Sequence, residues 1–214
     1  MLTNLNTGGL DQLLIPLLGD LYSWGKSYIQ KIVNPGMYEV LNYETTLEIL
    51  DIIGEKAILK KKEEVKFLQN NIIAYQDQAW GDGKFLLNYQ CSPGIPVDFY
   101  RSDYKTHILI SLREVKNKGD IIEFNIEWGI QNGFVCETGF WATEISQRTE
   151  NIIVQVIFPQ KRPPLRIWML EKNIQSSYTL GENEKKQLAD GRWLVRWEKN
   201  QPRLHEHYIL NWEW

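Results

Sequence analysis

From Met37 to the C-terminus, the chain consists of short segments in which apolar and polar residues alternate, separated by Gly, Pro, Asn or Asp. Residues 121–130 (IIEFNIEWGI) show this alternation most clearly. Alternation with period two places successive side chains on opposite faces of a strand, and closely spaced strands without intervening helices are typical of sandwiches and barrels. We therefore predict that residues 37–214 form one mostly β domain, an antiparallel β-sandwich of about eleven strands.

The composition agrees with a folded β domain. The 214 residues include nine Trp and ten Tyr, and large rings favour pleated, half-buried surfaces. Hydrophobic residues make up 43% of the chain and charged residues 24%, which are ordinary globular values. The formal net charge of −3 argues against a dedicated nucleic-acid-binding protein, which would carry a basic surplus.

Residues 56–68 (KAILKKKEEVKFL) are compatible with a charged helix or with a long strand. The strand is favoured because Val65 and Phe67 continue the parity of Ala57 and Leu59. We expect the charges at residues 60–64 to lie on an exposed or edge portion, where lysines prevent unwanted strand pairing.

Several turns and loops are predicted from their composition. The strands at residues 72–80 and 84–91 are expected to form a hairpin, because Gly81-Asp82-Gly83 joins them. The segments SPGIPVD (residues 92–98) and QKRPP (residues 160–164) are expected to be a rigid loop and a hairpin loop. The similar segments WLVRWE and YILNWEW are expected to pair with each other.

Residues 1–36 are predicted to be a separate amphipathic helix with a linker. Apolar residues within positions 10–33 recur at helical spacing, and Asn34-Pro35-Gly36 ends the pattern. The helix can pack on the β domain or bind another protein or a second copy of the chain. A membrane is a poor partner, because charges and Pro16 interrupt the stripe and the polar face is not basic. The partner-binding residues predicted on this stripe are Leu10, Leu14, Leu17, Leu21, Trp24 and Tyr28.

The strand at residues 72–80 and the turn after it hold the predicted binding site, because polar groups and aromatic rings are interleaved there. The predicted binding residues are Gln76, Asp77, Gln78, Trp80 and Asp82. With Asp98, the two aspartates could hold a divalent cation through oxygen ligands. A structural role is the favoured alternative, because aspartate between glycines is a common turn residue and Asp77 can satisfy backbone groups.

Other candidate chemistry is sparse. The nucleophile-elbow, P-loop, dinucleotide-binding, HExxH and CxxC patterns are absent from the sequence, and no metal or cofactor is predicted. His205 and His207 would share one side of a strand, but a transition metal needs a third ligand, so we interpret them as surface residues. No signal peptide is expected before Cys91 and Cys136, and both are expected to be reduced, buried thiols.

Four tryptophans are expected to pack in the core or at its rim, with an aromatic ligand cleft as the alternative. They are Trp141, Trp168, Trp193 and Trp197.

Two stretches carry a resemblance to an uncharacterised group of bacterial, largely cyanobacterial, β-rich proteins. They are FLQNNIIAYQDQAWGDG with CSPGIPVD, and the C-terminal RWLVRWEKNQPRLHEHYILNWEW. The similarity covers residues 37–214 and implies a bacterial, cytoplasmic protein with one coherent β unit. The group implies no activity and no functional residues.

These observations favour a non-enzymatic recognition module that works as an adaptor or sensor in a bacterial signalling or defence assembly. Two alternatives stay open. One is a metal-assisted hydrolase that uses Asp77, Asp82 or the pair His205 and His207. The other is a structural subunit that oligomerises through the N-terminal helix.

Overall fold

The computed structural model describes residues 36–81 and 83–214. The predicted helix within residues 10–33 and Asp82 lie outside these residues. The described part is mostly β, as predicted, with fourteen strands instead of about eleven. No helix in this part is long and apolar enough to span a membrane. The strands are β1 (Tyr38–Ile49), β2 (Lys56–Phe67), β3 (Ile72–Ala79), β4 (Lys84–Ser92), β5 (Ile95–Ser102), β6 (Lys105–Lys116), β7 (Ile121–Gln131), β8 (Thr138–Glu144), β9 (Thr149–Phe158), β10 (Arg166–Glu171), β11 (Ser176–Thr179), β12 (Lys185–Gln187), β13 (Trp193–Asn200) and β14 (His207–Glu213), with a short 3-10 helix η1 (Glu182–Glu184) before β12.

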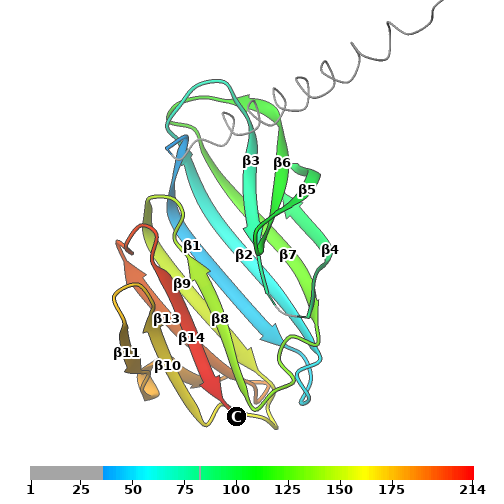
Figure 1. Ribbon diagram of the computed structural model, residues 1–214, viewed down its shortest axis with the longest axis vertical. Coiled ribbons are helices and arrows are strands. Elements are labelled where there is room, and N and C mark those ends of the chain that lie inside the picture. Colours follow the sequence, from blue (N-terminus) through cyan, green and yellow to red (C-terminus); the bar gives the residue numbers. More distant parts are fainter. Residues whose placement is uncertain (1–35, 82) are drawn as a thin grey trace, which may run out of the picture. The chain divides into compact units, whose positions relative to one another are not determined.

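The strands form three sheets (Figure 1). The large sheet has seven strands in the order β12-β13-β9-β1-β2-β7-β4. The four-stranded sheet has the order β11-β10-β14-β8, and the three-stranded sheet has the order β3-β6-β5.

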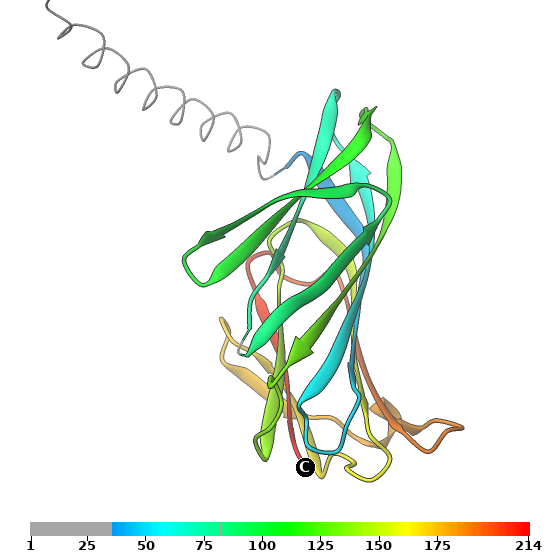
Figure 2. The same cartoon turned by 90° about the vertical axis from the view of Figure 1, so that its right-hand side faces the viewer.

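The two smaller sheets cover the same face of the large sheet (Figure 2). Tyr75 on β3 stacks on Phe124 of β7, with ring centroids 4.3 Å apart. Trp212 on β14 meets Phe158 of β9 edge-on at 5.4 Å. Each of these rings is almost fully buried, so the core lies between the large sheet and its two covers. The opposite face of the large sheet is polar, which explains the alternation seen along β7.

One strand pair departs from the predicted antiparallel arrangement. β1 and β9 run parallel, in a register that extends from Val40 opposite Thr149 to Glu48 opposite Ile157. All the other ladders among the described strands are antiparallel. The prediction is wrong here because period-two alternation defines the faces of a strand but not the direction of its neighbour.

The predicted hairpin at Gly81-Asp82-Gly83 is also wrong. β3 pairs with β6, whereas β4 pairs with β7, so the glycine link connects two different sheets. The predicted rigid loop SPGIPVD lies largely in strand β5 instead. The glycines permit a sharp change of direction, and each strand then pairs where its buried face is covered.

The predicted pairing of the two C-terminal segments is wrong as well. β13 pairs with β9 and β12, and β14 pairs with β10 and β8. Residues 160–164 join β9 to β10, which lie in different sheets, so they are not a hairpin loop. Similar aromatic segments therefore occupy opposite layers, where their rings fill the space between sheets.

Candidate ligand-binding site

Strand β3 divides the predicted binding residues between two faces. Asp77 points inward and is only 2% exposed, whereas Gln76 and Gln78 are half-buried on the opposite face. Trp80 follows the end of the strand and is also half-buried. Asp82 lies outside the described residues. The described residues of this set therefore have different surroundings.

Asp77 belongs to a buried cluster of charges between β3 and the large sheet. It forms an ion pair with Lys61 on β2, and the ammonium also lies 3.2 Å from the Glu63 carboxylate. Tyr89 donates a hydrogen bond to Asp77 at 2.8 Å, and Tyr75 donates one to Glu63. Lys61 and Glu63 are therefore buried, which corrects the prediction that residues 60–64 lie on an exposed or edge portion.

The electrostatics of this cluster follow from one ammonium beside two carboxylates. Burial and the charge of Asp77 raise the pKa of Glu63, and these effects outweigh the opposing attraction of Lys61. Burial lowers the pKa of Lys61, but Asp77 and Glu63 more than compensate, so its pKa is raised. Burial, together with Asp77, raises the pKa of Tyr89. Lys61 therefore stays charged and joins two sheets through an ion pair.

Gln76 and Gln78 make contacts that hold neighbouring elements together. The Gln76 side chain is hydrogen-bonded to Nδ1 of His107, whose pKa is lowered by burial and by the nearby Lys105 charge. Gln78 Nε2 donates to the hydroxyl of Ser146 at 2.9 Å, which links β3 to the segment after β8. Both glutamine side chains therefore have side-chain partners within the chain, whereas the structural interpretation expected backbone groups as partners.

A pocket of about 520 Å³ lies where the three sheets meet, and Trp80 belongs to its lining. Trp128 and Ile130 on β7 line it from the inner face of the large sheet. On one side the lining aromatic residues are Trp80, Phe85 and Tyr104, and on the other they are Phe134, Phe140 and Trp141. We call this the aromatic pocket. A concave, mainly apolar site with few polar groups is the usual form of a ligand-binding pocket.

Two cationic residues lie at the Trp80 side of the aromatic pocket. Lys105 Nζ lies 5.3 Å from the ring centre of Trp80 and 5.5 Å from that of Tyr104. The same ammonium forms an ion pair with Glu144 on β8. Arg101 is an exposed lining residue, and its Nε donates to the backbone carbonyl of Asp103 at 3.3 Å.

The pocket lining also contains a buried donor without a partner. The indole Nε1 of Trp141 is inaccessible to solvent and makes no hydrogen bond to any described residue. An indole nitrogen can only donate, so it needs an acceptor. Of the four tryptophans considered for an aromatic cleft, only Trp141 lines the aromatic pocket.

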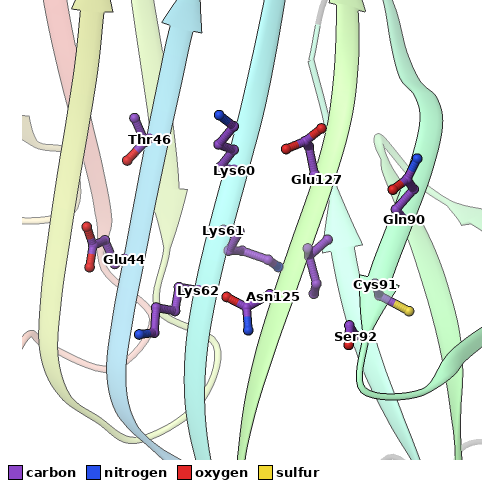
Figure 3. Close-up of a pocket in the computed structure, with 11 residues that line it drawn as sticks. Glu44, Thr46, Lys60, Lys61, Lys62, Gln90, Cys91, Ser92, Asn125 and Glu127 are labelled. Atoms are coloured by element: carbon purple, nitrogen blue, oxygen red, sulfur yellow. The ribbon is translucent and has the colours of Figure 1, made fainter.

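A second hollow, of about 390 Å³, has a different character (Figure 3). It is lined by β1, β2, β7 and β4, mainly with polar side chains such as Glu44, Lys60 and Lys62. Lys61 extends in a different direction from Lys60 and Lys62 (Figure 3). Lys62 is paired with Glu123 at 2.8 Å, and both side chains are exposed. These mixed charges are typical of a solvated sheet face.

The candidate metal ligands that the structure describes do not form a metal site. Within residues 36–81 and 83–214, no group of three His, Cys, Asp or Glu residues is placed to hold a metal ion. His205 precedes β14, has a φ of 64°, and does not continue the strand face of His207. His207 lies 3.7 Å from Glu144 instead.

The two cysteines are both free thiols. Cys91 is half-buried and Cys136 is exposed, so the expectation of two buried thiols is wrong. Cys136 belongs to the lining of the aromatic pocket.

Comparison with known proteins gives a likeness to solved structures only. No protein-family model matches the chain, and no curated protein matches it. An M1 zinc metallopeptidase from Deinococcus radiodurans has 8% sequence identity and a TM-score of 0.47. The E323A mutant of that peptidase, bound to a Tyr-Ser-Ala substrate, has 9% identity and a TM-score of 0.49. In each case the match covers 83% of this chain but 43% of the peptidase chain.

Sequence reasoning missed most of the aromatic pocket. Only Trp80 was predicted as a binding residue, and only Trp141 was considered for an aromatic cleft. Phe85 and Trp128 carry no local motif, and they come together because β4 pairs with β7. The available signal was the aromatic content of the chain, which indicates burial without indicating which rings share a cavity.

Proposed function

We propose that this protein is a non-enzymatic recognition module that binds its ligand or partner in the aromatic pocket. The observation that carries the proposal is the gathering of aromatic residues from three sheets around one open cavity of about 520 Å³. Aromatic rings provide large contact areas at little cost in side-chain entropy, which suits them to recognition sites.

The buried charge cluster supports the aromatic pocket as the binding site, because it fixes part of the pocket wall. Lys61 lies 6.0 Å from the ring centre of Trp128, and Tyr89 stacks on the same ring at 5.9 Å. Trp128, which lines the pocket, is therefore held by the groups that join β3 to the large sheet. A site whose walls are fixed by surrounding contacts loses less entropy when it binds.

In the cell, we propose that the module serves as an adaptor or sensor in a bacterial signalling or defence assembly. A cytoplasmic location is part of this proposal, as is the interpretation of the layered sheets as a β-sandwich. The adaptor or sensor role is supported by the aromatic pocket together with the predicted apolar helix stripe, since both kinds of surface are suited to contacts with partners.

A fragment screen by ligand-observed NMR tests the pocket as the binding site. Fragments that bind the native chain are expected to lose binding in Ala142→Phe, because Ala142 lines the aromatic pocket and a ring there would fill it. Thr138→Phe, at an exposed lining position, provides a second blocking variant that should disturb the core less. The matched control is Thr46→Phe in the polar hollow. Fragments that bind both blocking variants as well as the native chain would contradict the proposal.

A further inference from the structure

We infer that the aromatic pocket takes a small organic carboxylate with a planar aromatic body. This inference rests on the proposed function, because it names the chemical class of the ligand for the same pocket. Three features carry it: the rings that line the cavity, a lining arginine whose terminal nitrogens have no carboxylate partner among the described residues, and the cation that already lies over two of the rings.

The lining favours a flat aromatic body. Trp80 follows β3, Trp128 lies on β7 and Trp141 lies on β8, so strands of three different sheets position the three indoles. Rings placed around one space offer both faces and edges to a guest, and offset or edge-to-face contacts are the preferred aromatic geometries. A volume of about 520 Å³ falls within the usual range for small-molecule sites.

Arg101 favours an anionic head group. Arg101 uses Nε for the carbonyl of Asp103, and its terminal nitrogens have no carboxylate partner among the described residues. A carboxylate has two acceptor oxygens, and it matches the planar fork of a guanidinium in a bidentate arrangement. The described lining contains no Asp or Glu that would repel it.

An organic cation fits the same pocket poorly. Lys105 already lies over the rings of Trp80 and Tyr104, at 5.3 and 5.5 Å from their centres. A cationic guest would meet the charge of Arg101 and would compete with Lys105 for these rings. The pocket therefore discriminates by charge as well as by shape.

The test is calorimetric titration of the full chain with three probes of one shape: 2-naphthoate, 2-naphthamide and 2-naphthylmethylammonium. We expect 2-naphthoate to bind at least about tenfold more tightly than the amide, and the cation to bind most weakly. Arg101→Gln should reduce the affinity for 2-naphthoate to that for the amide without changing the affinity for the amide. Arg203→Gln, at another exposed arginine, is the matched control and should change neither.

Equal affinity for all three probes, or binding of none of them, would overturn the carboxylate assignment. The proposed function would still stand if screened fragments bound the native chain and lost binding in Ala142→Phe. If Ala142→Phe and Thr138→Phe left fragment binding unchanged, the pocket itself would be the wrong site.

Discussion

Lys61 on β2 and Asp77 on β3 form a buried ion pair that connects the large sheet to the three-stranded sheet. Both side chains are almost completely shielded from water, at 4% and 1% exposure. Breaking such a pair leaves a charge in a medium that solvates it poorly, and this cost exceeds what the intact pair contributes. The pair is therefore best tested by removing one partner and then by removing all the charges together.

Lys61→Met should lower the free energy of unfolding by about 3–5 kcal/mol, because Asp77 and Glu63 would lose their buried cation. Urea denaturation measures the change. Lys60→Met is the matched control, since the neighbouring Lys60 side chain is 53% exposed. Adding Glu63→Leu and Asp77→Leu to Lys61→Met should restore much of the loss. A single variant as stable as the control would contradict the structural role of the pair.

Glu63→Gln should reduce the dependence of stability on pH. Burial raises the pKa of Glu63, so between its ordinary value of 4.5 and the raised value the folded state binds more protons than the unfolded state. In the native chain, the free energy of unfolding is therefore expected to decrease as the pH rises above about 4.5. Chemical denaturation at a series of pH values should show a shallower decline for Glu63→Gln. The same slope in both chains would mean that Glu63 is not the responsible group.

Gly139→Ala should destabilise the protein by about 1–3 kcal/mol through overpacking. A Cβ at Gly139 would lie 2.5 Å from carbon atoms of the buried Trp212 indole, which cannot move freely. Thermal unfolding is a suitable measurement. Gly181→Ala is the control, because its nearest neighbour would be a Glu184 oxygen at 3.5 Å, an ordinary contact distance. Equal effects of the two substitutions would argue against close packing of β8 on Trp212.

Arg162→Ala should lower the free energy of unfolding by about 1–2 kcal/mol. The guanidinium lies 3.7 Å from the ring centre of Trp214 and donates to the carbonyls of Ile52, Ile53 and Cys136 at 3.1 to 3.2 Å. Denaturant titration with Trp fluorescence measures the loss. Arg162→Lys keeps the charge but lacks the planar fork, so its stability should lie between those of the native chain and Arg162→Ala.

The strands themselves could be predicted from the sequence, but their partners could not. Alternation along β7 follows the burial pattern residue by residue. The same parity in β2 places Lys61 and Glu63 on the face of Leu59 and Val65, yet their charges favoured an exposed position. Their compensating carboxylate and hydroxyls come from β3 and β4, which lie in other parts of the sequence and carry no local signal.

The candidate pocket could be predicted only in fragments. Trp80 and Trp141 were singled out for separate reasons, and nothing near them in the sequence indicates that they line one cavity. They lie close together because the three-stranded and four-stranded sheets cover the same face of the large sheet (Figure 2). The contacts of Gln76 and Gln78 could not be predicted either, because their partners His107 and Ser146 are distant along the chain.

The parallel neighbour of β1 is made late during synthesis. β1 leaves the ribosome before β9, which closes its free edge and begins at Thr149. Until then the nascent chain exposes a strand edge whose N–H and C=O groups can recruit other chains. Completion of the central part of the large sheet therefore relies on a contact between segments far apart in the sequence, and contacts of this kind generally form slowly.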